Sequence, residues 1–410
     1  MPLTNSMEWM MNPRFEQQVS EDGPAAFLNP ERIEAVNRLV ASMDGYVPTP
    51  LVNLPALAGF WGLGAIYVKD ESKRFGLNAF KVLGGIHAVA NVICRRLGVG
   101  MNDMTFQQLI SEETREKLGD LLFVTATDGN HGRGIAWAAR QMGQRAVVFM
   151  PKGSSACRLE MIQQEGAEAS ITEMNYDDAV RHAREYAQAH DGIVVQDTAW
   201  EGYEEIPAWI MQGYAVMMEE ISGQLKELGK LPPTHVFLQA GVGSFAGAIQ
   251  GYLAAKWGEH RPQTVVVEPD QADCYFRTAS IDDGMPHAVT GDMATIMAGL
   301  ACGEPNLLGW KILRKYTRAF VSCADPLAAR GMRILAAPMA GDPVVISGES
   351  GAVGMGVLAE MMQQNTDGER LAKALQMNAE SRILIISTEG DTDPDQYRRI
   401  VWEGAYPSQK

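Results

Sequence analysis

The sequence predicts an α/β protein with parallel sheets that helices cover on both faces, and three observations support this. Short apolar runs alternate with segments of helical pattern, as in the run at residues 122–126 and the pattern at residues 135–140. Glycine-bearing turns separate the two kinds of segment, and no repeat of solenoid length occurs. Strands that are apolar along their whole length are typical of sheets buried on both faces. We therefore expect open, twisted, mostly parallel sheets.

The order of the elements along the chain suggests two domains. The expected strands lie at residues 122–126, 146–150, 193–195, 235–239, 264–268 and 382–387. The expected helices lie at residues 135–140, 154–165 and 215–233, and from the turn at 241–247 through residue 255. A chain of 410 residues is longer than a single core usually grows. We place a smaller α/β domain at residues 90–210 and a larger domain at residues 1–89 and 211–410.

The composition argues against several classes of partner and site. A net charge of −15 repels phosphate backbones and anionic lipids, which disfavours nucleic acid and membrane as partners. No membrane-length apolar stretch and no secretory signal are readable, so we expect a cytoplasmic protein. The cysteines form no CxxC pair and no zinc-like cluster, so we expect no metal. The sequence does not decide whether Cys274 and Cys302 form a disulfide.

A lysine at the start of an apolar, glycine-containing helix is the first candidate for chemistry. Lys81 follows Phe80 within the segment KDESKRFGLNAFKVLGG at residues 69–85. A lysine amine forms imines readily only where burial or neighbouring cations lower its pKa. An isolated lysine is far more often a solvated surface side chain than a catalytic one. Lys81 is therefore a candidate only in combination with the other motifs.

A polar loop follows the expected strand at residues 122–126 and opens a helix. Residues 125–134 read TATDGNHGRG. The free amides and the positive end of a helix at such a loop suit a carboxylate. Asp128 would repel that anion, which suggests a separate role in proton transfer. Asp and Asn are equally common helix caps, and His131 alone is as well explained by packing beside the turn.

A glycine-rich turn joins the expected strand at residues 235–239 to the next helix. Residues 239–248 read QAGVGSFAGA, and closely spaced glycines let backbone amides approach a phosphate. No Gly-Lys-Ser/Thr ending follows, which disfavours a nucleoside triphosphatase. A dinucleotide-dependent oxidoreductase stays open, with Glu268 as the nearest candidate for binding a ribose.

The expected strand at residues 382–387 runs directly into hydroxyl and carboxyl groups. Residues 385–393 read IISTEGDTD. A hydroxyl beside an aromatic ring nitrogen leaves that nitrogen neutral, whereas a carboxylate would hold a proton on it. Ser387 and Thr388 are therefore candidates for such a contact, although an ordinary exit from a strand explains them equally well. Ser350, in the turn at residues 348–351, is a similar case.

Together, and in this order, the four motifs resemble the fold-type II family of pyridoxal-5'-phosphate (PLP) enzymes, the group of the tryptophan synthase β-subunit and threonine dehydratase. Within it, the sequence is most similar to the diaminopropionate ammonia-lyase family over nearly its whole length. The markers of this similarity are FKVLG at 80–84, ATDGNHGRG at 126–134, QDTAWEGY at 196–203, VEPDQAD at 267–273 and SGESG at 347–351. Asp128 stands where dehydratase-like relatives carry a serine, and this departure marks the subgroup.

The resemblance implies a fold with the cofactor between the two domains, a homodimer, and a role for each matched residue. Lys81 would carry PLP as a Schiff base next to Phe80, and Asn130 would bond the 3'-oxygen of the cofactor. Gly241, Val242, Gly243 and Ser244 would hold the phosphate, and Ser387 or Thr388 would meet the pyridine nitrogen. Thr127, Asp128, Gly129 and His131 would bind the carboxylate of a small amino-acid substrate.

The resemblance also implies the reaction, which is elimination of ammonia from D- and L-2,3-diaminopropionate to give pyruvate and two ammonia. Lys81 would act at Cα of the L isomer and Asp128 at Cα of the D isomer. Asp197 would hold the β-ammonium group or assist proton removal from the D isomer, unless it is a buried structural aspartate. The alternatives are a serine or threonine dehydratase or a β-replacement synthase on the same fold, the oxidoreductase, and a regulator that has kept a degenerate site.

Overall fold

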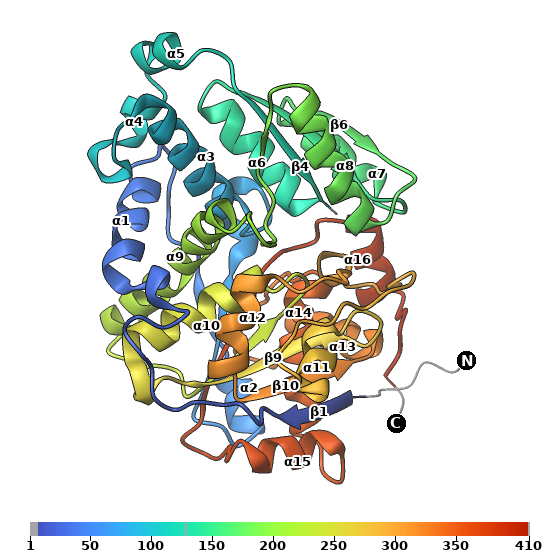
Figure 1. Cartoon of the computed structure of the whole chain (residues 1–410). Helices are drawn as coiled ribbons and strands as arrows, with labels where there is room; N and C mark the ends of the chain where they lie inside the picture. Colours follow the sequence, from blue (N-terminus) through green and yellow to red (C-terminus); the bar gives the residue numbers. More distant parts are fainter. Residues whose placement is uncertain (1–6, 128, 409–410) are drawn as a thin grey trace.

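Two separate β-sheets organise the chain, which confirms the prediction of an α/β fold with mostly parallel sheets. The computed structural model describes residues 7–127 and 129–408. In Figure 1 the smaller sheet, with α6, α7 and α8 around it, lies above the larger sheet and its helices. Asp128, one of the predicted site residues, lies outside the described residues.

The larger sheet has seven strands in the order β1-β10-β9-β8-β11-β3-β2. They are β1 (Met7–Met11), β2 (Leu51–Asn53), β3 (Ala65–Asp70), β8 (His235–Gln239), β9 (Gln263–Pro269), β10 (Ala319–Cys323) and β11 (Arg382–Ser387). Only the two edge strands pair antiparallel, β1 with β10 and β2 with β3. All residues of β8 and β10 are buried, as expected for strands covered on both faces.

The smaller sheet has four strands in the order β6-β5-β4-β7, and every pair is parallel. They are β4 (Leu122–Ala126), β5 (Arg145–Met150), β6 (Glu168–Ile171) and β7 (Ile193–Val194). This sheet lies within the predicted smaller domain at residues 90–210. Helices α3 and α9 run across the two predicted boundaries, so that division remains a prediction.

Helices cover both sheets and follow most strands. They are α1 (Pro30–Ala41), α2 (Pro55–Phe60), α3 (Val82–Leu97), α4 (Phe106–Leu109), α5 (Glu112–Leu118), α6 (Asn130–Gln141), α7 (Ala156–Gln164), α8 (Tyr176–Ala189), α9 (Glu205–Glu227), α10 (Ser244–Trp257), α11 (Cys274–Ile281), α12 (Leu307–Tyr316), α13 (Asp325–Ala336), α14 (Glu349–Met361), α15 (Asp367–Ala374) and α16 (Pro394–Val401). Short 3₁₀ turns occur at Ala26–Leu28, Glu71–Gly76, Met101–Asp103, Gly258–His260 and Ala298–Leu300. Across the described ranges, no helix has the length and apolarity that crossing a membrane requires.

Helix α9 begins at Glu205, earlier than the predicted residue 215. Its first turn contains Pro207. Proline is tolerated in the first turn of a helix, where its missing N–H has no intrahelical acceptor in any case. The added turns pack closely on α3. A Cβ atom on Gly213 would lie 2.3 Å from the carbonyl oxygen of Leu83, so this contact requires glycine. The contact fixes the first turn of α3, which follows Lys81 directly.

Candidate active site

A cavity lies where strands of both sheets reach their carboxyl ends. This is the position at which open α/β sheets bind ligands. Its lining includes most of the predicted site residues: Phe80, Lys81, Thr127, Asn130, His131, Asp197, Gly241, Val242, Gly243, Ser244 and Thr388. Gly129 and Ser387 are not part of the lining.

Lys81 and Asp197 meet at the wall of this cavity. The Nζ atom of Lys81 lies 2.6 Å from Oδ2 of Asp197, and the lysine side chain keeps 16% of its surface exposed. The hydroxyl of Tyr176 lies 3.5 Å from the other carboxylate oxygen. Burial alone would raise the pKa of Asp197, but the nearby charges of Lys81 and His131 outweigh burial and lower it to about 2. Asp197 is therefore ionised at neutral pH.

The backbone of Asp197 is held against the glycine-rich turn. The Ser244 hydroxyl donates to the carbonyl oxygen of Asp197. The Asn306 side chain donates to the Ser244 hydroxyl at 2.5 Å and caps α12 through its own oxygen. The aspartate that follows the smaller sheet and the glycine-rich turn that follows β8 of the larger sheet are thus joined at the cavity.

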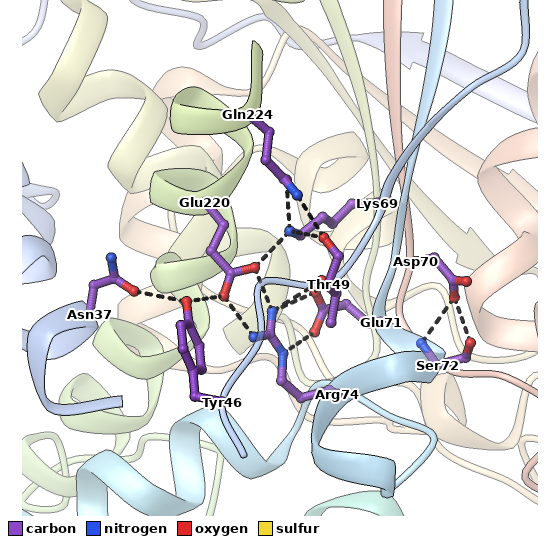
Figure 2. A network of polar contacts seen from close by, with 10 residues as sticks. All are labelled: Asn37, Tyr46, Thr49, Lys69, Asp70, Glu71, Ser72, Arg74, Glu220 and Gln224. Carbon is purple, nitrogen blue, oxygen red and sulfur yellow. Dashed lines mark hydrogen bonds and ion pairs between the residues drawn. The ribbon is translucent and has the colours of Figure 1, made fainter. Parts of the chain in front are cut away.

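A buried ionic cluster fixes the segment that leads to Lys81 (Figure 2). We call it the anchor network, and it consists of Lys69, Glu71, Arg74 and Glu220, with Tyr46, Thr49 and Gln224 around them. Arg74 binds Glu71 at 2.8 Å and Glu220 at 2.7 Å, and all three side chains are at most 1% exposed. Glu220 belongs to α9, so the network attaches the segment before Lys81 to the same helix that packs on α3.

The loop before α6 is ordered by Thr127. Its hydroxyl accepts hydrogen bonds from the amides of Gly129, at 2.9 Å, and Gly132, at 3.1 Å. Gly129 has a φ of +151°, and a Cβ atom there would lie 2.9 Å from Cδ of Arg158, so only glycine fits. His131 Nε2 lies 2.8 Å from the carbonyl oxygen of Val195, which can only accept, so Nε2 carries the proton.

The turn at residues 241–244 has the shape that a phosphate requires. Gly243 has a φ of +89°, and a Cβ atom there would lie 2.1 Å from the hydroxyl of Tyr275. Helix α10 begins at Ser244, so the first amides of this helix have no intrahelical acceptor and face the cavity with the positive end of the helix dipole. Backbone amides in this arrangement bind phosphate groups.

The two hydroxyls at the end of β11, those of Ser387 and Thr388, have different surroundings. The Ser387 hydroxyl is buried and lies 2.8 Å from the hydroxyl of Ser347, away from the cavity. The Thr388 hydroxyl lines the cavity and accepts a hydrogen bond of 2.8 Å from Nε2 of Gln239. Because that oxygen already accepts, the hydroxyl proton of Thr388 is available to a ring nitrogen in the cavity.

Three buried polar atoms on the cavity wall have no partner among the described residues. They are Oε1 of Gln239, Oγ of Ser350 and Oε1 of Glu389. Buried polar atoms are normally hydrogen-bonded, so their absence of partners indicates that a polar ligand belongs here. A phosphate cradle, a lysine, a hydroxyl facing a ring nitrogen and these spare atoms together fit PLP.

Glu268, the residue considered for binding a ribose, is already committed to the fold. Its carboxylate is buried and accepts hydrogen bonds from the amides of Tyr275, at 2.8 Å, and Phe276, at 2.7 Å. It caps the start of α11 and offers no free oxygen to a sugar hydroxyl. The geometry therefore disfavours the dinucleotide-dependent oxidoreductase.

The cysteines beside the cavity are not cross-linked. Cys302 lines the cavity, and Cys274 is buried behind the glycine-rich turn with its sulfur 3.9 Å from the carbonyl oxygen of Gly241. No disulfide joins Cys274 to Cys302 in the part of the chain that the structure describes.

Sequence reasoning missed four residues that complete the site: Tyr176, Gln239, Asn306 and Glu389. Glu389 and Gln239 belong to motifs that were identified from neighbouring residues. Their position near the end of a strand was the feature that could have indicated a role in the site. Tyr176 and Asn306 begin distant helices, and nothing local connects them with the cavity.

Comparison with known proteins agrees with this geometry. The sequence profile of the family described as "Pyridoxal-phosphate dependent enzyme" matches residues 43–388. The diaminopropionate ammonia-lyase of Salmonella typhimurium is 56% identical over 88% of this chain and 90% of its own length. That of Escherichia coli K12 is 52% identical over 88% of this chain and 89% of its own length. The crystal structure of the E. coli enzyme in complex with D-serine superposes with a TM-score of 0.90 at 45% identity and covers 99% of both chains. The chain therefore belongs to the PLP-dependent enzymes and, within them, to the diaminopropionate ammonia-lyases.

Proposed function

We propose that the cavity eliminates ammonia from both the D and the L isomer of 2,3-diaminopropionate. One water is consumed, and one pyruvate and two ammonia are released. The observation that carries the proposal is the contact of 2.6 Å between Lys81 and an ionised, buried Asp197 at the cavity wall. It places a nitrogen base and a carboxylate that prefers a cation at the same point.

The residues around the cavity would hold PLP from several sides. Lys81 would bond it covalently, the amides of residues 242–244 would bind its phosphate, and Thr388 would donate to its ring nitrogen. Asn130 would contact its 3'-oxygen. When bound, PLP supplies an electron sink that stabilises negative charge at Cα of the amino acid.

Asp197 selects a substrate with a β-ammonium group. Once the amine of Lys81 is bonded elsewhere, the Asp197 carboxylate loses its partner at 2.6 Å while it stays buried. A buried carboxylate that has lost its nearest cation is costly, so the site favours a ligand that supplies another. The β-ammonium of diaminopropionate does so, and the same contact keeps that nitrogen protonated, which an amine needs in order to leave. The hydroxyl of serine offers no such charge.

Two bases on opposite faces of Cα would account for both isomers. Lys81 removes the α-proton of the L isomer, and Asp128 removes that of the D isomer. Thr127, Gly129 and His131, in the loop before α6, hold the substrate carboxylate next to the helix amides. The enamine that is released then hydrolyses to pyruvate and the second ammonia.

The test is turnover of D- and L-diaminopropionate by the holoenzyme, followed through pyruvate, beside the variant Asp128→Asn. We expect activity with both isomers in the wild type. In the variant, activity toward the D isomer should fall by about 10²-fold or more, and activity toward the L isomer should fall far less. D-serine serves as the reference substrate without an ammonium group. Undiminished turnover of the D isomer by Asp128→Asn would remove Asp128 from this role.

A homodimer, which the family resemblance implies, and a cytoplasmic location, which the sequence patterns suggest, are further parts of the proposal. Light scattering on the purified holoenzyme tests the first, and a single species of monomer mass would contradict it.

A further inference from the structure

Glu389 lies at the cavity wall, and the proposed chemistry does not use it. It directly follows Thr388, is 2% exposed and lines the cavity. Backbone hydrogen bonds tie its neighbours to the segment before Lys81, from Phe80 N to Thr388 O at 3.1 Å and from Gly390 N to Asn78 O at 3.0 Å. The carboxylate is therefore held in a fixed place beside the cofactor site.

The two oxygens of Glu389 have different environments. Oε2 accepts from Nδ2 of Asn130 at 2.6 Å and from the Thr392 hydroxyl at 3.3 Å. Oε1 is buried and has no partner among the described residues. A buried carboxylate oxygen without a donor points to a ligand that supplies one.

The contact with Asn130 crosses between the two sheets. Asn130 begins α6, which packs on the smaller sheet, and Glu389 follows β11, an interior strand of the larger sheet. An amide nitrogen carries two protons, so a bond from one of them to Glu389 leaves the other for an acceptor in the cavity. It also excludes the flipped orientation, in which the amide oxygen would face the carboxylate and repel it.

We propose that Glu389 is a positioning residue that fixes the side-chain amide of Asn130 so that its second N–H faces the 3'-oxygen of PLP. Glu389 acts through Asn130, and the charge-assisted bond makes this orientation strongly preferred. The inference rests on Asn130 contacting the cofactor, which the family resemblance implies.

The test is a double-mutant cycle on cofactor affinity, measured by titrating PLP into the cofactor-free full chain and following fluorescence. We expect Asn130→Ala to raise the Kd for PLP by about tenfold or more, and Glu389→Gln by about five- to tenfold. The double variant should bind no more than about twofold more weakly than Asn130→Ala alone, because Glu389 has nothing left to orient. Additive losses would overturn the proposal.

Glu349→Gln is the matched control, because it makes the same change at another buried glutamate, one that lines the neighbouring cleft. It should leave the Kd for PLP within about twofold of the wild type. If Asn130→Ala leaves the Kd unchanged, the assumed contact of Asn130 fails. If Asn130→Ala weakens binding and Glu389→Gln does not, the positioning role alone fails.

The visible spectrum gives a second readout that a purely structural role would not change. The 3'-oxygen belongs to the chromophore, so hydrogen bonds to it tune the absorption of the bound cofactor. At one fixed pH and with saturating PLP, Glu389→Gln should change the visible bands in the same direction as Asn130→Ala, and Glu349→Gln should not. A wild-type spectrum in Glu389→Gln would contradict the proposal.

Discussion

Two buried glutamates, Glu220 and Glu389, show how differently the same side chain is used within one molecule. In the anchor network both oxygens of Glu220 are occupied: Oε1 accepts from Arg74 and Tyr46, and Oε2 accepts from Arg74 and Lys69. At the cavity wall, Oε2 of Glu389 is occupied and Oε1 has no donor among the described residues. Both carboxylates are almost fully buried.

This difference distinguishes polar groups that stabilise the fold from polar groups that are available to a ligand. The anchor network balances two cations against two carboxylates, as Figure 2 shows, and leaves nothing for a ligand. We call the polar residues of the cavity wall the active-site cluster, which includes Lys81, Asp197 and Glu389. This cluster keeps unused hydrogen-bonding groups in place, which lowers the stability of the ligand-free protein. Mutations in the first cluster should therefore reduce mainly stability, and mutations in the second mainly function.

The sharpest contrast is expected at Lys81. Lys81→Ala removes the amine that would bond the cofactor, so activity should fall by about 10³-fold or more and the visible band should be lost. The free energy of unfolding of the cofactor-free protein should fall by only about 1–2 kcal/mol, since the cavity can admit water to Asp197. Pyruvate assays, spectra and urea titration measure the three quantities. Residual activity close to wild type would refute the role of Lys81.

The opposite pattern is expected at Glu220. Glu220→Gln leaves Arg74 and Lys69 buried with reduced compensation, so the free energy of unfolding should fall by about 3–5 kcal/mol while the folded protein keeps most of its activity. The Arg74 charge outweighs burial and lowers the pKa of Glu220 to about 2, from an ordinary value of 4.5. The stabilisation by Glu220 is therefore complete above pH 4.5 and lost as the pH falls toward 2.

Urea titrations of Glu220→Gln at several pH values test this window. The stability gap to the wild type should close on acidification. Glu227→Gln, an exposed change on the same helix, is the control and should have no measurable effect. A gap that is absent at pH 7 would mean that the anchor network does not stabilise the fold.

Asp197→Asn tests the active-site cluster at the position that meets the substrate. With D- or L-diaminopropionate, kcat/KM should fall by about 10²-fold, because the amide cannot balance the β-ammonium. Turnover of D-serine should fall less, since that substrate carries no β-charge. Equal losses with both substrates would show that Asp197 has only a structural role.

The smallest effect is expected at Glu349, which is buried beside Glu389. Burial and, less strongly, the charge of Glu389 raise its pKa from an ordinary 4.5 to about 7. The folded protein holds this proton more tightly than the unfolded chain, so wild-type stability should fall as the pH rises from about 4.5 through 7. Glu349→Gln should remove about 1–3 kcal/mol of that decline. Unfolding curves at pH 5 and pH 8 measure it, and equal slopes in both proteins would contradict the burial argument.

The sequence was sufficient to predict an element or a motif where a single short segment contains all the residues that define it. The apolar runs that form β4, β8 and β11 were predicted with their observed limits, and the lysine, the polar loop and the glycine-rich turn were found from residue type and spacing. In each sheet the parallel strands end at one edge, and the motifs converge because the cavity lies where these edges of the two sheets meet.

The remainder depends on contacts between segments far apart in sequence. Glu220 and Arg74 are 146 positions apart, and no local pattern identifies them as partners. The edge strands β1 and β2 carry no continuous apolar run, because one side of each is open. Which hydroxyl at the end of β11 faces the cavity depends on Ser347 and Gln239, which lie in other parts of the chain.

The place of β11 in the larger sheet has a consequence for how the protein is made. It lies between β8 and β3, yet it follows every other described strand in the sequence. The four-stranded sheet is contiguous in sequence and can form early, whereas β3 waits for its parallel neighbour until residues 382–387 have been made. The wall formed by the larger sheet is therefore completed only after β11 has been made, so a nascent chain that stops before residue 382 has only one side of the site that holds the cofactor.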